Sequence, residues 1–372
     1  MRTVRALLYR DILASVLFVA LAFLSLFFFV DFVDELEGVG QRGRTTWHAV
    51  LAALLELPGH LYELLPIAVL IGGIYSLSRL AQSSEFTILR TGGLGPGRAL
   101  RLLAVLGVGF AIATFVVGDV VAPAAEQQLV QLKSRFAGGV AIGGAGAWLK
   151  ERREGTGTEA GRSYSVNVAG TGPGGTLTGV RIFEFDDNGA LVSRLAAPQA
   201  RVGDDGTWTL TEAELTRWPA ARDGERPAVA LSSHATLDWP STLDQRVVAA
   251  AVMPVSTMST LELWRYSEHL ADQAQASQSQ RIRFWRKALY PLSCLVMVAL
   301  ALPFAYLHAR AGGVSLRVFG GIMLGISFVL LNNLAGHIGN LQGWTPWVAA
   351  SVPSLLYLLM SLAAFTWLVR YR

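Results

Sequence analysis

The chain has 372 residues, of which 52% are hydrophobic and only 16% are charged. That composition is too apolar for a soluble protein of this length and predicts an integral membrane protein. The formal net charge is +4, but no basic run with interleaved aromatic residues occurs, which excludes a typical nucleic-acid-binding protein. A single cysteine, Cys294, excludes an intrachain disulfide.

Six apolar segments are long enough to cross a membrane as helices. The first, Ile12–Val30, has no charged residue, and at ~1.5 Å per residue it approaches the ~30 Å of a hydrocarbon core. It is longer than a signal-peptide core, and no small-residue cleavage site follows it, so we expect a retained span. The other spans are predicted near residues 64–78, with an apolar extension back to 47, and near 101–119, 288–307, 318–334 and 344–369.

A short polar segment, residues 79–98, separates the second span from the third. Ser83 or Ser84 is suited to cap a helix, and the glycine pair at 92–93 is suited to end it. We expect a helix of about three turns here, which a partner protein could push as a lever. Its acid, Glu85, fits the favourable N-terminal end of the helix dipole. The apolar residues Phe86, Ile88 and Leu89 also suit a helix lying in the bilayer interface.

Basic residues gather at alternate ends of the predicted spans. They are Arg2, Arg5 and Arg10 before the first span, Arg79, Arg90, Arg98 and Arg101 after the second, Arg310 and Arg317 after the fourth, and Arg370 and Arg372 at the end. The opposite loops are acidic or uncharged. Because basic loops stay in the cytoplasm, both termini are predicted to be cytoplasmic and the long polar insert is predicted to lie outside.

The insert, residues 123–255, changes to strand periodicity. The segments SYSVNV, GVRIFEF, TWTLTEAEL and ATLDW alternate in polarity, and turn signals occur at Asp186–Gly189, Asp204–Gly206 and Arg222–Gly224. This pattern predicts an antiparallel β sandwich or open barrel, with an apolar core that includes Phe183, Phe185, Trp208 and Leu210. Residues 1–122 and 256–372 are then the two membrane halves.

Helical periodicity returns between Ser256 and Gln280. Leu261, Trp264 and Leu270 share one face of this segment, while Glu262, Glu268 and Gln273 lie elsewhere. We therefore predict a surface helix that leads back into the membrane.

The chain carries no recognisable catalytic motif. It has no P-loop, no G-x-S-x-G elbow and no H-E-x-x-H, and its histidines are scattered through the sequence. No acid or base lies deep inside a predicted span, which argues against a proton-relay transporter. The sequence therefore predicts no enzyme active site, and neither a metal nor a cofactor bound by this chain.

The fifth span contains polar and small residues that are candidates for contacts between helices. Asn332 and Asn333 suit an interhelical hydrogen bond, or else the lining of a gate. Gly321 and Gly325 form a small-xxx-small pair that permits a close helix contact, with a helix that the pattern leaves open.

Several segments together resemble the LptF/LptG family of lipopolysaccharide export permeases. They are FVDELEGVG after the first span, LPIAVLIGGIYSLSRLAQSSEFTILRTGG, VAPAAEQ, FWRKALYPLSCLVMVALALPF and GWTPWVAASVPSLLYL. The resemblance covers both membrane halves, while the β insert matches in position and length more than in residues. FVDELEGVG and the region around GWTPWV favour the LptG branch over the LptF branch.

The resemblance implies a six-span permease of the bacterial inner membrane with a periplasmic β-jellyroll. It implies a heterodimer with an LptF-like permease, an LptB-like ATPase dimer that binds the ATP and Mg²⁺, and an LptC-like single-span partner. Such a complex takes lipopolysaccharide from the outer leaflet of the inner membrane and passes it to a periplasmic bridge. The alternatives are an LptF-type subunit, or a membrane-anchored periplasmic scaffold or chaperone that needs no ATPase.

The resemblance also implies roles for particular residues. The helix near residues 83–93 becomes the coupling helix, with ATPase contacts expected at Ser84, Glu85, Phe86, Leu89 and Arg90. Phe27 and Phe28 fall where the family has a lateral gate, although a run of phenylalanines also suits a lipid-facing or core position.

Lipopolysaccharide carries phosphates, so basic residues near the outer ends of spans are candidate substrate contacts. They are Arg42, Arg44, Lys133, Arg135, Arg283, Arg286 and Lys287. Arg283, Arg286 and Lys287 equally suit anchoring to phospholipid headgroups. Family members carry lysines after the first span, whereas this chain has the acids Asp31 and Glu37 there. Either Arg42 and Arg44 replace those lysines, other positions bind the substrate, or the acids bind phosphate through divalent cations.

Overall fold

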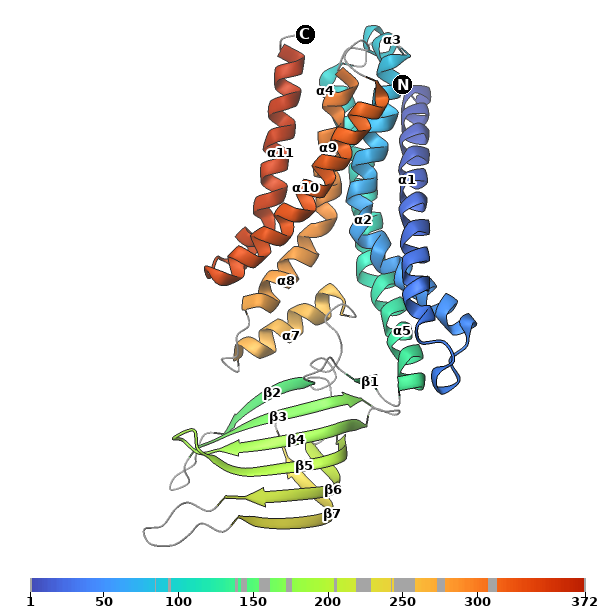
Figure 1. Ribbon diagram of the computed structural model, residues 1–372. Coiled ribbons are helices and arrows are strands. Elements are labelled where there is room, and N and C mark those ends of the chain that lie inside the picture. The colour runs from blue at the N-terminus through green and yellow to red at the C-terminus, as the bar shows by residue number, and fades with distance from the viewer. Residues whose placement is uncertain are drawn as a thin grey trace. The chain divides into compact units, whose positions relative to one another are not determined.

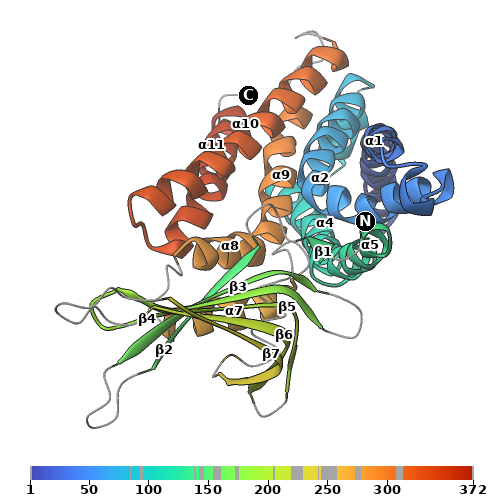
Figure 2. The same cartoon turned by 60° about the horizontal axis from the view of Figure 1, so that its bottom comes forward.

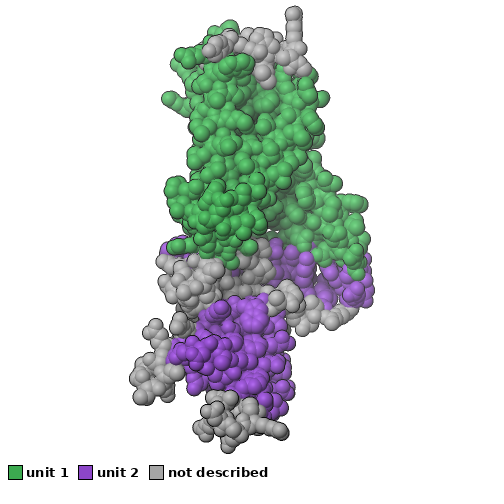
Figure 3. Space-filling view, turned by 60° about the vertical axis from the view of Figure 1, so that its left-hand side comes forward, with its two compact units in different colours: residues 1–37, 53–125, 278–372 green, residues 38–52, 126–277 purple. Residues whose placement is uncertain are grey.

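The computed structural model describes residues 2–83, 85–92, 95–137, 140–141, 146–153, 161–171, 176–203, 206–218, 229–241, 243, 258–272, 278–306 and 313–370. They form two compact units, coloured separately in Figure 3. The helical unit comprises residues 1–37, 53–125 and 278–372. The second unit comprises residues 38–52 and 126–277 and contains the β domain.

Six helical segments are long and apolar enough to cross a membrane, as the sequence predicts. The first two are α1 (Arg2–Leu36) and α2 (Thr46–Gln82). The third runs through α4 (Pro96–Val116), a π-helical turn (Val117–Val121) and α5 (Ala122–Ala137). The fourth runs through α8 (Gln278–Leu289), a short 3₁₀ turn (Tyr290–Leu292), α9 (Ser293–Ala301) and a second 3₁₀ turn (Leu302–Tyr306). The last two are α10 (Val314–Leu341) and α11 (Pro346–Arg370).

Both chain ends and the short helix α3 (Glu85–Thr91) lie at the same end of the helical unit (Figure 1). This arrangement agrees with an even number of spans that run alternately up and down. Helices α1 and α2 form a hairpin. Near this end an ion pair of 2.8 Å between Asp11 Oδ2 and Arg79 Nη2 joins the two helices.

Helix α2 is the centre of the helical unit. In its most apolar part 72% of the residues are buried, against 22% for α1 and α10. The core around it includes Ala68, Leu70, Ile74 and Leu77. A helix that is surrounded by other helices needs apolar residues on all of its faces.

The third span changes from α-helical to π-helical hydrogen bonding where the ring of Tyr62 packs against it. Gly118 lies in the π-helical turn, and a Cβ placed there would come within 2.3 Å of the Tyr62 ring of α2. Tyr62 in turn packs on Tyr290, with ring centroids 4.8 Å apart. The absence of a side chain at Gly118 therefore lets α2 and the third span approach closely.

The described strands of the β domain form one antiparallel sheet. Its order is β3 (Arg162–Thr171), β4 (Leu177–Phe185), β5 (Leu191–Val202), β6 (Thr207–Arg217) and β7 (Ala230–Pro240), with β1 (Val140–Ala141) and β2 (Ala147–Arg153) both paired to β3. The sheet is twisted but not closed (Figure 2). The predicted strands are all present, and the Asp186–Gly189 signal falls between β4 and β5. Of the Asp204–Gly206 signal, Gly206 precedes β6, and the other two residues lie outside the described residues. The Arg222–Gly224 signal lies outside the described residues.

The alternation of inward and outward residues changes phase along one row that crosses the sheet. Thr178, Gln199 and Thr211 pair with one another in this row, across β4, β5 and β6, and the register of the pairing stays continuous through them. The backbone departs from ordinary strand geometry beside the row, where Gly179 has φ +63° and Glu212 has φ +53°. The inward face buries Val166, Ile182, Leu195, Trp208 and Leu210, together with other apolar residues of β2 to β6.

The predicted core of the β domain is half right. Trp208 and Leu210 are fully buried. Phe183 is not in the core, because its neighbour Ile182 takes the inward position and the alternation of a strand turns Phe183 outward. There its ring stacks on exposed Trp148, with centroids 5.9 Å apart. Phe185 is half-buried and lies outside the core cluster.

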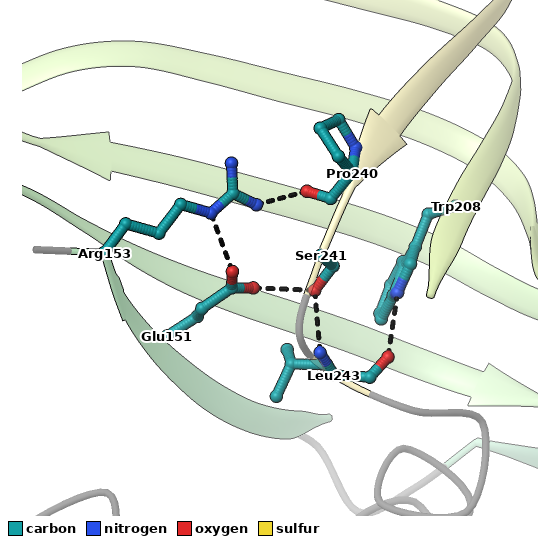
Figure 4. Close-up of polar contacts among 6 residues, drawn as sticks. All are labelled: Glu151, Arg153, Trp208, Pro240, Ser241 and Leu243. Atoms are coloured by element: carbon teal, nitrogen blue, oxygen red, sulfur yellow. Dashed lines mark hydrogen bonds and ion pairs between the residues drawn. The ribbon is translucent and has the colours of Figure 1, made fainter. Parts of the chain in front are cut away.

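Polar contacts fasten the end of β7 across the concave face to β2 (Figure 4). Ser241 Oγ donates to Glu151 Oε2 at 2.6 Å, and Glu151 also pairs with Arg153 at 2.8 Å. Arg153 donates to the Pro240 carbonyl, and Trp208 Nε1 donates to the Leu243 carbonyl at 3.2 Å. Glu151 is only 2% exposed, so these partners are what makes its burial tolerable.

The guanidinium of Arg153 also lies over the aromatic ring of Tyr164, on the neighbouring strand β3. Its carbon is 4.7 Å from the Tyr164 ring centroid. Burial raises the pKa of Tyr164, which therefore stays a neutral phenol at physiological pH. The contact is accordingly a cation–π interaction.

The surface helix predicted between 256 and 280 is divided. α7 spans Thr260–Asp272, and α8 begins at Gln278 and continues into the fourth span. A capping box starts α7, because Ser259 N donates to Glu262 Oε2 at 2.8 Å and Glu262 N donates to Ser259 Oγ at 3.3 Å. The predicted apolar face is wrong: Leu261 and Trp264 are exposed, and Leu263 and Ser267 are buried instead. The side chain of Leu270 lies outside the described residues.

Candidate functional site

The predicted coupling segment is a helix of seven residues, α3, at the end of the helical unit that holds the chain termini (Figure 1). This is about two turns, shorter than predicted. Ser83 does not cap α3, because its Oγ donates back to the Leu80 carbonyl of α2. Ser84 and the side chains of Phe86 and Arg90 lie outside the described residues.

The described side chains of α3 divide into two groups. Leu89 packs against the core of the helical unit. Glu85 is exposed in the first turn, and Ile88 is 66% exposed. An acid beside an exposed apolar residue on a short anchored helix is a surface that a second protein can contact.

At the opposite end, Arg286 of α8 reaches into the helical unit. Its Nη2 donates to Asn333 Oδ1 of α10 at 2.7 Å. Arg286 and Asn332 line one small pocket, together with Leu289, Tyr290, Ser293, Phe328, Ala350 and Ser354. The structure thus brings together two candidates that are distant in sequence, and it shows that Asn333 makes the interhelical hydrogen bond expected of the pair.

Small residues let this arginine fit. Gly336 lies one turn after Asn333, and a Cβ there would come within 2.9 Å of Arg286 Nη1. The neighbouring Tyr290 hydroxyl donates to the Glu63 carbonyl of α2 at 2.5 Å. Arg286 therefore lies within a polar patch inside the long fourth span, which begins before the predicted residue 288.

The other basic candidates differ in their surroundings. Arg283 is exposed and Lys287 is half-buried on α8. Lys133 is exposed near the end of α5. Arg44 follows a 3₁₀ turn at Gln41–Gly43, and its guanidinium lies against Gly38. The side chains of Arg42 and Arg135 lie outside the described residues. Lys133 and Arg44 belong to one unit and Arg283, Arg286 and Lys287 to the other.

The predicted close-contact pair on α10 meets α2. A Cβ at Gly321 would lie 2.6 Å from Ile74 Cδ1, and one at Gly325 would lie 3.1 Å from Ile67 Cγ2. The sequence leaves the partner of this motif open, and the structure identifies it as the central helix.

The phenylalanines at the end of α1 make two different contacts. Phe27 stacks on His60 of α2, with ring centroids 4.6 Å apart. Phe28 stacks on Phe32 of its own helix at 6.1 Å. His60 Nε2 also lies 3.0 Å from Asp31 Oδ2, and Glu56 lies beside both. Sequence analysis missed this group because its members come from two helices, although Glu56 and His60 have the spacing that shares one helix face.

Comparison with known proteins identifies the family. Residues 6–368 match the family described as lipopolysaccharide export system permease LptF/LptG. The chain belongs to the LptF/LptG family. Two relatives carry the name lipopolysaccharide export system permease protein LptG. The protein from Haemophilus influenzae is 24% identical, and the one from Escherichia coli K12 is 25% identical. The matches cover 94% and 95%, respectively, of both chains.

Membership of the LptF/LptG family confirms the resemblance read from the sequence and supports a lipopolysaccharide export permease. The six membrane-capable helices and the inserted antiparallel sheet confirm the predicted fold class. In this family context, α3 and the Arg286 patch lie at opposite ends of the same helical unit.

Proposed function

We propose that this chain is the LptG-type permease subunit of an ATP-driven transporter that extracts lipopolysaccharide from the outer leaflet of the bacterial inner membrane. The extracted lipopolysaccharide then passes to a periplasmic bridge that leads toward the outer membrane. The observation that carries the proposal is the match of nearly the whole chain, residues 6–368, to the permease family, with relatives named LptG.

The energy source in this proposal is a separate subunit. The sequence has no P-loop, so an LptB-like ATPase dimer supplies ATP hydrolysis, and α3 is its docking element through Glu85, Leu89 and the adjoining residues of the coupling segment. ATP binding and hydrolysis then shift the population between two arrangements of the spans. An LptF-like permease completes the cavity, and an LptC-like protein adds one span.

The substrate contacts in this proposal are basic groups at the end of the helical unit away from α3. Arg286 is the strongest of them, because it is held by Asn333 beside a pocket. Arg283 and Lys287 follow on the same helix, and Arg42, Arg44, Lys133 and Arg135 are further candidates in the unit that contains the β domain. Both termini are cytoplasmic and the β domain is periplasmic in this arrangement.

Affinity purification of the tagged chain from its native membrane tests the proposal. A permease is expected to bring with it a nucleotide-hydrolysing subunit and a second, paralogous permease. A periplasmic scaffold or chaperone elutes without an ATPase, and that result would overturn the proposal. An LptF-type subunit is distinguished by the identity of the paralogue that elutes with it.

A further inference from the structure

Three side chains that suit a metal ion meet near one end of α1 and α2. Asp31 lies five residues before the end of α1, and Glu56 and His60 lie on the facing part of α2. One ligand atom from each lies within 4.8 Å of the other two, and Asp31 Oδ2 and His60 Nε2 are 3.0 Å apart. Among the described residues, no other group of three histidine, cysteine or acidic side chains has such spacing.

The two helices hold these side chains by ordinary packing. Glu56 and His60 are four residues apart, so they project from the same face of α2. Phe27 stacks on the imidazole of His60 at 4.6 Å and so orients its Nε2 toward Asp31, one helical turn further along α1. The side chains of His60 and Asp31 are 27% and 12% exposed, so the group is sheltered but reachable from solvent.

The ligand atoms of the group are of the kind that a divalent cation takes. Two carboxylates offer oxygen atoms and the imidazole offers a ring nitrogen, a donor set found around Zn²⁺ in proteins. Tetrahedral ligands at ~2.1 Å from an ion lie roughly 3.4 Å apart, so the observed spacing needs only small side-chain rotations.

We propose that Asp31, Glu56 and His60 bind one divalent transition-metal ion of the Zn²⁺ type, which joins α1 to α2. The imidazole selects this class, because Ca²⁺ takes about six to eight oxygen ligands and this group offers a nitrogen and two carboxylates. This part of the inference does not depend on the transport function.

Three protein ligands leave a four-coordinate ion with an open position. An oxygen donor fills it, and a phosphate oxygen of lipopolysaccharide is such a donor. This second step rests on the proposed function. It gives the acidic end of the first span a way to contact an anionic lipid that it would otherwise repel.

Metal binding to the full-length chain, purified in detergent without a histidine tag, tests the site. Co²⁺ serves as a spectroscopic probe and Zn²⁺ as its competitor. We expect about one Co²⁺ per chain, with visible absorption bands that Zn²⁺ abolishes, and Zn²⁺ is expected to raise the thermal unfolding temperature. His60→Gln and Asp31→Asn should each weaken binding by at least about ten-fold.

The matched control is His337→Gln, which removes an exposed histidine of α10 and should leave Co²⁺ binding unchanged. If the wild-type chain binds no Co²⁺ or Zn²⁺, or if His60→Gln and Asp31→Asn bind as well as His337→Gln, the site is overturned. Comparable unfolding temperatures of metal-free wild-type and Asp31→Asn chains show that a loss of binding is not a loss of folding.

Addition of lipopolysaccharide to the Co²⁺-loaded chain tests the second step. A change in the Co²⁺ bands with lipopolysaccharide, and none with the same lipid after removal of its phosphates, supports a phosphate ligand. Unchanged bands overturn the phosphate contact and leave both the metal site and the proposed transport function standing.

Discussion

At the scale of single residues, three polar contacts join different helices of the helical unit. Arg79 pairs with Asp11, Arg286 with Asn333, and the Tyr9 hydroxyl donates to the Leu102 carbonyl at 2.8 Å. Hydrogen bonds depend on direction and distance, so each contact specifies how two helices meet, which hydrophobic packing alone does not.

Glu85→Ala should uncouple the ATPase without unfolding the helical unit, because Glu85 is exposed and Leu89 anchors α3. Removing a good interface contact costs about 1–2 kcal/mol, roughly a five- to thirty-fold weaker ATPase contact. Lipopolysaccharide release per ATP hydrolysed, measured on the reconstituted complex, checks this. The matched control is Gln82→Ala, also exposed and just before α3. Equal release by the two variants removes Glu85 from the coupling mechanism.

Arg286→Gln should reduce the amount of lipopolysaccharide that stays bound to the purified complex. Glutamine still reaches toward Asn333 as a donor, but it loses the charge that attracts phosphate, and a charge-assisted hydrogen bond contributes about 1.5–3 kcal/mol. Arg283→Gln, an exposed position on the same helix, is the control and should have a smaller effect. Quantifying bound lipid A by mass spectrometry checks both. A larger effect at Arg283 would place the substrate on the outer face of α8.

At the scale of elements, glycines decide how closely helices approach α2. Gly72 faces the backbone of Val16 on α1, Gly73 faces Ala301 on α9, and Gly321 faces Ile74 from α10. An added Cβ would meet different groups at these glycines. The end of a flexible side chain can move aside, whereas backbone atoms cannot. The tightest constraint is therefore at Gly72, outside the small-xxx-small motif that the sequence makes conspicuous.

Gly72→Ala should destabilise the contact between α1 and α2, because the new Cβ would lie 2.6 Å from the Val16 backbone nitrogen. Overpacking of this kind costs about 1–3 kcal/mol. Gly59→Ala on the same helix has no atom within 4 Å of the new Cβ and is the matched control, expected to be neutral or slightly stabilising. Thermal unfolding of the detergent-purified chains compares them. Equal melting temperatures would contradict the assignment of a close backbone contact.

The sequence predicts most elements, and each miss has a physical cause. The spans and strands β3, β4, β6 and β7 follow from apolar length and alternation. Strand β5 escapes prediction because it is rich in alanine, contains Pro198 and changes the phase of its alternation near Gln199. Phe183 is predicted in the core because it is large and apolar, but the phase of β4 gives the inward position to Ile182. In α7, the apolar residues outnumber the positions that one face can bury.

At the scale of the whole molecule, the chain has two hydrophobic cores. One lies among the helices and the other on the concave face of the sheet, and the residues of the two clusters do not overlap. Each unit therefore has its own stabilising interior, and damage to one interior need not unfold the other.

Trp208→Ala should unfold the β domain while leaving the helical unit intact. Trp208 is 0% exposed and donates to the Leu243 carbonyl, so its loss leaves a cavity and an unpaired acceptor, about 3–5 kcal/mol. Trp148→Ala, on the outer face at 55% exposure, is the control. Limited proteolysis with mass spectrometry is expected to show new cleavage within residues 140–243 for the first variant alone. Simultaneous loss of protection in the spans would show that the units fold as one.

The sequence by itself determined the membrane class, the six spans and the position of the inserted sheet, because these features depend on length, composition and period, which are local and repeat along the chain. The family followed from the resemblance of particular segments in the two membrane halves. Only the tertiary structure decided that α10 meets α2, that Arg286 binds Asn333, and that Asp31, Glu56 and His60 converge. Those contacts join residues far apart in sequence, and hydrophobic periodicity records which face of a helix is buried but not which helix covers it.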